Sequence, residues 1–207
     1  MKLLAALLVC TAFAAQAQPA ASDLVTAAYR DNSNGLRDLI AKGGNPNAQD
    51  AQGRTPLTFA LLAESEHAIT ELLATPSIDV NAPNGKDETP LMMAAIKGRL
   101  DLVKLLYKHR AQINRAGWTP LHYAASGPDD GVAAWLIQQG ADLNARAPNG
   151  NTPLMMAAKY GPIDLALELV KLGADLTARN QQGLCAADFA AGANRDGLQK
   201  LLQPRPR

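Results

Sequence analysis

The sequence has few cysteine and histidine residues, the side chains that most often form disulfides or bind metals. Two cysteines occur among 207 residues, and Cys10 lies in a segment that we expect to be removed from the mature chain. Cys185 alone cannot form an internal disulfide, so packing must stabilise the fold. The three histidines, His67, His109 and His122, include no pair spaced i, i+4 and none lies beside a cysteine. We therefore expect no metal and no cofactor.

Aromatic residues and an excess of one charge are also lacking. The chain has 20 Lys and Arg against 19 Asp and Glu, and loss of Lys2 with a leader would leave 19 of each. A mature net charge of zero gives no reason to expect binding to nucleic acid. Aromatic residues make up 4% of the chain, whereas Ala and Leu recur throughout. This composition favours closely packed helices and an all-α fold.

No apolar run is long enough to cross a bilayer, which takes about 20 residues. The longest run, from Leu3 to Ala15, follows Lys2 and ends in an A-x-A pattern completed by Ala17. These are the three parts of a secretory signal. We expect residues 1–17 to be a signal peptide that is cleaved after Ala17.

A lipoprotein signal is the alternative interpretation, with Cys10 as the lipidated residue. Val9 stands where a small residue is expected, and the apolar run continues past Cys10. Lipidation therefore ranks second. We expect the mature chain to be periplasmic or secreted, with no membrane attachment.

A Thr-Pro-Leu triplet occurs four times, with an alanine at the same offset after each copy. Threonine can cap a helix, and proline is tolerated at the first helical position because it lacks a donor there. Leucine-rich segments such as 100–106 and 163–170 then provide an apolar stripe for a second helix. Each copy therefore predicts a pair of short helices. The triplets begin at Thr55, Thr89, Thr119 and Thr152.

The third copy reads Thr-Pro-Leu-His-Tyr-Ala from Thr119, and the copies follow one another at about 30 to 34 residues. Gly-Ala-Asp-Leu endings at 140–143 and 173–176 complete the pattern, which resembles the ankyrin repeat. The resemblance implies an all-α solenoid of stacked helix-turn-helix units with β-hairpin fingers. Weaker copies at both ends fit capping units, which must face water.

We expect four full repeats and two capping units in one ankyrin-repeat domain that spans residues 18–203. The tail at 204–207 is expected to be disordered. The predicted boundaries are 22–54 for the first cap, 55–88, 89–118, 119–151 and 152–184 for the repeats, and 185–203 for the last cap.

Three departures from the pattern have structural consequences. The stretch 114–119 is three residues shorter than its counterpart 47–55, which predicts a truncated finger. Arg110 occupies the position of a left-handed glycine, a conformation that costs a non-glycine residue roughly 1 to 2 kcal/mol. Pro76 replaces the corresponding glycine one repeat earlier, where the exit is one residue longer. That change should alter a loop and leave the fold intact.

The side chains that could carry chemistry fit structural roles better. His122 occupies a motif position where the family uses histidine to bond neighbouring backbone. Adjacent Asp129 and Asp130 would point apart and fit a helix start. Cys185 fits a small buried residue, and Trp135 fits core spacing on a second helix. The pairs Met92-Met93 and Met155-Met156 fit core packing better than a copper or oxidation site. We therefore expect that the protein is not an enzyme.

The ankyrin resemblance also implies where a partner would bind, because ligands of the family lie along the concave side. The residues expected along the concave side carry both positive and negative charge, which suggests a protein-binding surface. Trp118 and Tyr160 are the preferred anchors, since aromatic residues dominate interface energetics. The predicted partner-binding residues are Arg54, Lys86, Glu88, Ile96, Lys97, Trp118, Asn151, Lys159 and Tyr160.

The leading functional hypothesis is a monomeric, non-enzymatic adaptor of the periplasm that holds a protein partner. The family includes small exported bacterial proteins associated with catalase and peroxide protection, so a role in oxidative stress is one implication. A secreted effector or a toxin antagonist is the alternative. A peroxide-reactive enzyme that uses Cys185 or the methionine pairs ranks last.

Overall fold

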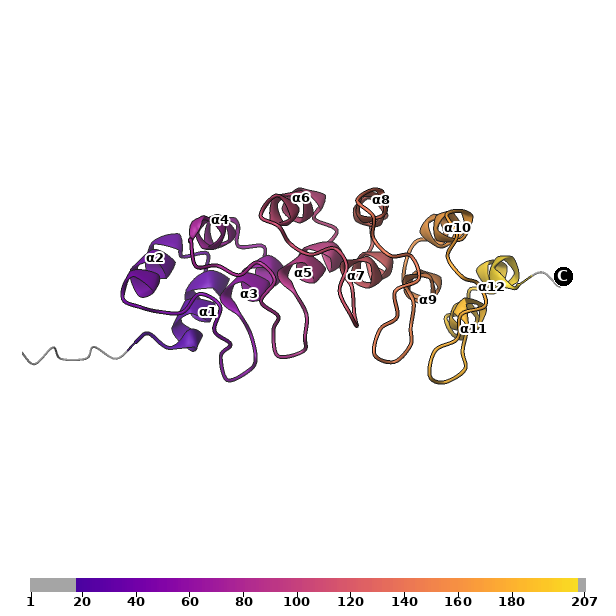
Figure 1. The fold of residues 1–207 in the computed structure, drawn as a ribbon, viewed down its shortest axis with the longest axis horizontal. Helices are drawn as coiled ribbons and strands as arrows, with labels where there is room; N and C mark the ends of the chain where they lie inside the picture. Colours follow the sequence, from indigo (N-terminus) through magenta and orange to yellow (C-terminus); the bar gives the residue numbers. More distant parts are fainter. Residues whose placement is uncertain (1–17, 205–207) are drawn as a thin grey trace, which may run out of the picture.

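The computed structural model describes residues 18–204, and over that range it consists of twelve α-helices and loops. The helices form an inner and an outer row, and the stack bows so that the fingers extend from its concave side (Figure 1). The inner row comprises α1 (Ala21–Tyr29), α3 (Pro56–Ala63), α5 (Pro90–Ile96), α7 (Pro120–Ser126), α9 (Pro153–Lys159) and α11 (Ala186–Gly192). The outer row comprises α2 (Ser33–Ala41), α4 (Glu66–Ala74), α6 (Leu100–Lys108), α8 (Gly131–Gln138), α10 (Ile163–Lys171) and α12 (Asp196–Leu202).

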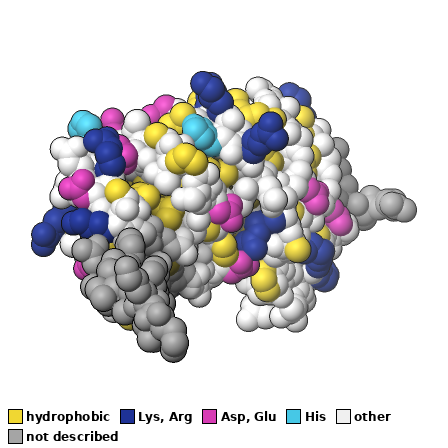
Figure 2. Space-filling model, turned by 60° about the vertical axis from the view of Figure 1, so that its left-hand side comes forward, with side chains coloured by type: hydrophobic (Ala, Val, Ile, Leu, Met, Phe, Trp, Pro, Cys, Tyr) yellow, Lys and Arg dark blue, Asp and Glu magenta, His cyan; other side chains and the backbone are white. Residues whose placement is uncertain are grey.

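The solenoid predicted from the repeat is therefore confirmed. The expected signal peptide at 1–17 and most of the expected disordered tail, 205–207, lie outside the described residues. Within 18–204, no helix is both long and apolar enough to span a membrane. On the face that Figure 2 shows, basic and acidic side chains are interspersed among apolar ones, in keeping with their nearly equal numbers.

Each Thr-Pro-Leu triplet starts an inner helix at its proline, as predicted. Thr55 has extended backbone, and its hydroxyl accepts a hydrogen bond from the N–H of Thr58 at 3.3 Å. Thr152 caps α9 in the same way through the N–H of Met155, at 3.4 Å. The inner helix α5 has 7 residues, well below the length at which an isolated helix is stable. Packing between repeats must therefore supply most of the stability.

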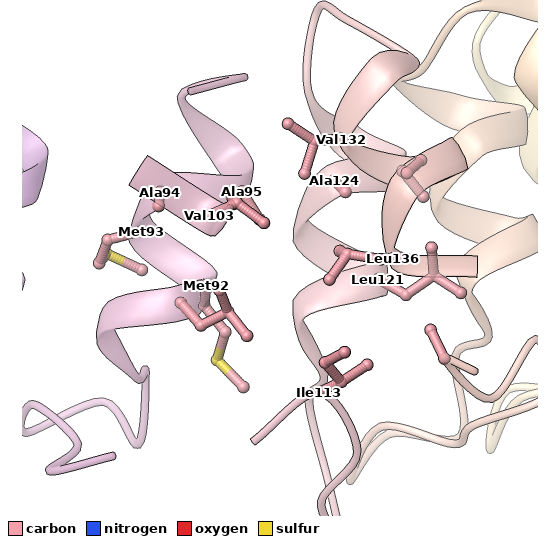
Figure 3. Packing of buried hydrophobic residues seen from close by; sticks show 14 of the residues in the cluster. Met92, Met93, Ala94, Ala95, Val103, Ile113, Leu121, Ala124, Val132 and Leu136 are labelled. Atoms are coloured by element: carbon pink, nitrogen blue, oxygen red, sulfur yellow. The ribbon is translucent and has the colours of Figure 1, made fainter. Parts of the chain in front are cut away.

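Small and flexible residues fill the space between repeats. The motif alanine is fully buried in each of the four copies, which lets neighbouring inner helices approach closely. In Figure 3, side chains of α5 face those of α7, with Met92 and Ala95 opposite Leu121 and Ala124. Of the two methionine pairs, Met92, Met93 and Met155 are buried as predicted, whereas Met156 is only partly buried.

A ladder of asparagines connects consecutive repeats. Each asparagine donates from its side-chain amide to a backbone carbonyl of the next repeat. Its side-chain oxygen accepts from the backbone N–H of the residue two positions after that carbonyl. Asn114 donates to the carbonyl of Gly140 at 2.8 Å and accepts from the N–H of Asp142 at 2.9 Å. The same two bonds are made by Asn47, Asn81 and Asn144.

The predicted β-hairpin fingers are present as loops, and over 18–204 no residue is assigned to a strand. Four long fingers each close with two backbone bonds, for instance from the N–H of Asn84 to the carbonyl of Glu88 and from the N–H of Asp87 to the carbonyl of Asn84, both at 2.9 Å. A polar side chain within each finger accepts a backbone N–H of the same loop; it is the first residue of fingers 1, 2 and 5 and the middle residue, Asn149, of finger 4. We number these fingers 1 (50–54), 2 (84–88), 4 (147–151) and 5 (180–184).

All three predicted departures lie at the expected places. Finger 3 (114–118) is visibly shorter than its neighbours in Figure 1. Arg110 adopts the left-handed conformation with φ of 69°, where the next repeat has Gly140 at 86°. Near Pro76, the residue that follows α4, Thr75, has extended backbone, so no left-handed residue is needed there. The loop changes there and the helix stacking continues.

Candidate functional site

Three shallow hollows follow the inner side of the stack, each between finger bases and the exposed face of inner helices. The first hollow, of about 270 Å³, lies between fingers 1 and 2 and has Phe59 and Leu62 on its floor. It brings together three predicted residues, Arg54, Lys86 and Glu88. The Arg54 guanidinium lies 4.7 Å from the centre of the Phe59 ring and donates from Nε to the Asp50 carboxylate at 2.7 Å.

The central hollow is smaller, about 210 Å³, and almost wholly apolar. It unites the predicted residues Ile96 and Trp118. The Trp118 indole stands edge-on to His122 and Tyr123, with ring centres 5.2 and 6.3 Å apart. Because these rings hold one another, Trp118 is already ordered before any partner arrives. The lining residues are Ile96, Trp118, His122, Tyr123, Ser126 and Met156.

A hydrogen bond across repeats fixes the polar end of Tyr123. Its phenol donates to Oε1 of Glu88 at 2.9 Å, and Oε2 of Glu88 accepts from the Asn84 amide at 2.7 Å. Burial raises the pKa of Tyr123, and the charge of Glu88 raises it further. The phenol therefore stays a donor at any physiological pH. Glu88 serves to orient Tyr123, so its carboxylate is already satisfied within the chain.

The third hollow, of about 370 Å³, lies between fingers 4 and 5 and the helices α9 and α11. Lys159 and Phe189 line it together with the amides of Asn149 and Asn180. The predicted residue Asn151 also borders it but is 7% exposed. Its carbonyl oxygen lies 3.0 Å from Nε2 of His122, and its side-chain oxygen accepts from Asn180 at 2.9 Å. Asn151 thus connects neighbouring repeats.

Two predicted residues lie in none of these hollows. Lys97 forms an ion pair with Glu64 at 2.7 Å. The hydrogen bond from Lys97 and its positive charge lower the pKa of the Glu64 carboxyl group. Tyr160 is 56% exposed, with the Lys159 ammonium 4.9 Å from its ring centre. The structure therefore does not bring the two preferred anchors, Trp118 and Tyr160, into one pocket.

Sequence reasoning missed one row of residues on the inner helices. The fifth residue of each motif copy faces the hollows in four repeats, and it is aromatic or methionine in every copy. Aligning the copies on their threonines would have revealed it, because an offset of four from the cap returns the side chain to one face. The row comprises Phe59, Met93, Tyr123, Met156 and Phe189, of which Met93 is buried.

The side chains considered for chemistry have the structural roles predicted for them. His122 is fully buried with Nδ1 2.9 Å from the Thr119 hydroxyl, and burial lowers its pKa. Cys185 is buried, and its backbone N–H donates to Asp188 at 2.8 Å. Asp129 accepts from the N–H of Gly131 at the start of α8. Among residues 18–204, no group of three or more His, Cys, Asp or Glu is arranged to hold a metal ion.

Comparison with known proteins agrees with this geometry. A sequence profile of ankyrin repeats, built from three copies, matches residues 24–116, 63–147 and 114–180. The chain belongs to the ankyrin-repeat family. Ankyrin repeats are protein-interaction modules, and homologues with them are typically non-enzymatic binding proteins.

The individual relatives differ widely in size. The ankyrin repeat and SAM domain-containing protein 6 of Mus musculus is 33% identical over 128 residues, which cover 60% of this chain and 14% of that protein. Protein phosphatase 1 regulatory subunit 27 of Mus musculus is 40% identical over 78 residues, covering 36% of this ankyrin chain and 49% of that one. The match thus spans a small part of the first relative.

A solved structure is similar over nearly its whole length. It is a chain from the complex of a predatory endopeptidase of Bdellovibrio bacteriovorus with an immunity protein. The TM-score is 0.72 at 27% sequence identity, and the match covers 89% of this chain and 98% of that one.

Proposed function

We propose that this ankyrin protein is exported to the periplasm as a monomer and holds one partner protein on its concave side, without cofactor or chemistry. The central hollow carries this proposal. Its apolar lining and ordered aromatic rings match the centre of a protein interface, where aromatic anchors in desolvated pockets supply most of the affinity. The first and third hollows on either side, which include charged and amide side chains, would form the rim.

A pull-down from periplasmic extract tests the binding surface. The bait is the mature chain, compared with Trp118→Ala, Tyr160→Ala and an outer-row control, Leu172→Ala, all with equal helicity. Leu172 is 45% exposed, so its removal is a matched loss of exposed apolar area. We expect Trp118→Ala to weaken capture at least tenfold, or about 1.4 kcal/mol, and Leu172→Ala to leave it unchanged. Equal capture by all variants would refute the concave site.

A toxin antagonist is the second candidate, favoured by the likeness to a chain from an endopeptidase–immunity complex. An immunity protein would bind one peptidase from the same cell and block its activity. The test is to incubate the purified chain with peptidoglycan-cleaving and protein-cleaving peptidases encoded beside it. Stoichiometric inhibition that Trp118→Ala abolishes would support this candidate. Unchanged rates for every such peptidase would dismiss it.

Cell fractionation and peroxide assays separate the remaining roles. Retention in the periplasm would argue against a secreted effector, and release into the medium would favour one. A role in oxidative stress predicts that deletion of the protein sensitises cells to peroxide, through a partner. The purified chain itself should leave peroxide unconsumed, because Cys185 is only 7% exposed.

A further inference from the structure

The row of fingers is interrupted at its middle. A backbone bond joins fingers 1 and 2, from the N–H of Gly85 to the carbonyl of Gly53 at 2.6 Å. Another joins fingers 4 and 5, from Gln181 to Asn149 at 3.0 Å. Within residues 18–204, no backbone bond joins finger 2 to finger 4. The short finger 3 stands between these two joined pairs and leaves a gap in the row.

The central hollow lies at that gap. Trp118 is the last residue of finger 3, and the helices α5, α7 and α9 supply the rest of the lining. Arg115 turns finger 3 toward finger 2, because its guanidinium donates to the backbone carbonyl and the carboxylate of Asp87, both at 2.8 Å. A protruding element of another protein can therefore reach Trp118 through the gap between fingers 2 and 4.

The size of the central hollow limits what can occupy it. Small-molecule sites usually measure about 300 to 1,000 Å³ and enclose their ligand. A hollow of about 210 Å³ that opens to solvent suits one large apolar side chain. The polar groups within it, the Tyr123 phenol, the His122 imidazole and the Ser126 hydroxyl, already have partners in the chain. The hollow thus offers apolar contact and no free hydrogen-bonding group from either ring.

The carboxylates and the lysines around the gap differ in whether they already have partners within the chain. Each carboxylate along the inner surface is engaged by a donor of this chain: Asp50 by Arg54, Glu64 by Lys97, Asp87 by Arg115, Glu88 by Tyr123 and Asp188 by the Cys185 backbone. Lys86 in finger 2 and Lys159 at the end of α9 are exposed. Neither forms an ion pair with the described residues. These lysines place an ammonium group that has no ion pair within residues 18–204 on either side of the central hollow.

We propose that the partner presents a protruding loop that enters the gap at finger 3. One aromatic or large aliphatic side chain of this loop fills the central hollow, and carboxylates on either side of it face Lys86 and Lys159. Complementary charge of this kind steers encounter and fixes orientation. The inference rests on the proposed function, since it specifies the partner of the same concave surface.

A phage-displayed library of disulfide-closed loops, with randomised sequence, tests the chemistry without knowledge of the natural partner. The mature chain serves as the target. We expect the enriched loops to carry an aromatic or large aliphatic residue between Asp or Glu residues. Their affinity should fall at least about tenfold on Trp118→Ala and recover substantially in Trp118→Phe, which keeps an aromatic ring.

Charge reversal tests the electrostatic part. The double variant Lys86→Glu, Lys159→Glu should weaken the enriched loops about tenfold at low salt and less at high salt. The control Lys42→Glu, Lys104→Glu makes the same change in net charge at exposed lysines at the end of α2 and in α6, and should have little effect.

Each opposite outcome has a distinct meaning. No enrichment, or enriched loops with basic flanks that still depend on Trp118, would overturn the inference and leave the concave site standing. Loops that ignore Trp118 and instead lose binding on Leu172→Glu would overturn the proposed function as well.

Discussion

The long fingers and the short finger 3 obtain their rigidity in different ways. In a long finger, a polar side chain such as Asn84 holds the N–H groups of Lys86 and Glu88 within the same loop, at 2.9 and 3.0 Å. Finger 3 lacks the three residues that would make such a turn. Its own Arg115 ties it to Asp87 of finger 2, and the buried ring of His122 accepts from the N–H of Thr119 at its base. Shortening a finger therefore shifts its support onto neighbouring repeats and exposes an aromatic cluster.

The largest effect should follow from removing the support beneath finger 3. His122→Ala leaves the buried Thr119 hydroxyl and Asn151 carbonyl without a partner and opens a cavity, so the free energy of unfolding should fall by about 3 kcal/mol. His122→Met copies the residue found in α5 and α9 and should cost about half as much. Urea unfolding measures both. A loss below about 0.5 kcal/mol in His122→Ala would contradict this role.

A smaller effect is expected at the left-handed residues that precede the fingers. Gly140→Ala should lower the free energy of unfolding by about 1 to 2 kcal/mol, because φ is 86° although a methyl group there would meet no atom within 4 Å. Arg110→Gly, at the same position one repeat earlier, should raise it by about 0.5 kcal/mol, since relief of strain exceeds the entropy of glycine. Thermal unfolding of the two variants should shift in opposite directions. Equal shifts would show that Arg110 is unstrained.

Lengthening finger 3 converts the short form into the long form. Inserting Ala-Pro-Asn after Arg115 adds the three missing residues, and loop closure predicts a change in stability below about 1 kcal/mol. Acrylamide quenching of Trp118, measured in a Trp135→Phe background, should decrease because the longer finger covers the central hollow. Unchanged quenching would mean that the short finger does not control access.

The smallest effects concern pH, and the two histidines with perturbed pKa values should act in opposite directions. Burial lowers the pKa of His122, so its contribution is complete above the ordinary histidine pKa and is lost as pH falls below it. The hydrogen bond to Asp31 raises the pKa of His67, so its contribution is complete below the ordinary value and is lost as pH rises through the raised one.

Stability curves of two variants between pH 5 and 8 measure these contributions. Relative to the native chain, His67→Gln should lose more stability at pH 5.5 than at pH 8. His122→Met should lose less at pH 5.5 than at pH 8. Identical pH profiles for both variants would contradict the assignment.

The fold could be predicted because the same local sequence pattern occurs in four consecutive repeats. The pattern consists of a threonine cap, a proline at the first helical position and a buried alanine, and each of these depends only on nearby residues. Stacking the repeats then builds the whole domain from this one unit. The short finger and the strained Arg110 were predictable for the same reason, as gaps in a periodic pattern. The absence of strands from the fingers was not, since two backbone bonds within a single turn fall short of a ladder.

The site was harder to predict because exposure depends on contacts between repeats. Glu88 and Asn151 occupy finger positions typical of partner contacts, but Tyr123, His122 and Asn180 from other repeats engage them. Those partners lie about 30 residues away along the chain, beyond the reach of a single motif. Position alone placed most of the predicted residues along the three hollows without separating free side chains from engaged ones.

The most direct measurement of the concave binding site is photo-crosslinking in cells. A photoreactive benzoyl-phenylalanine replaces Ser126, in the central hollow, or Leu172, in the groove between α8 and α10 on the outer row. We expect a discrete crosslinked protein from position 126 that is absent from position 172 and is lost on Trp118→Ala. A crosslink from position 172 alone would contradict this expectation and place the partner on the opposite side of the stack.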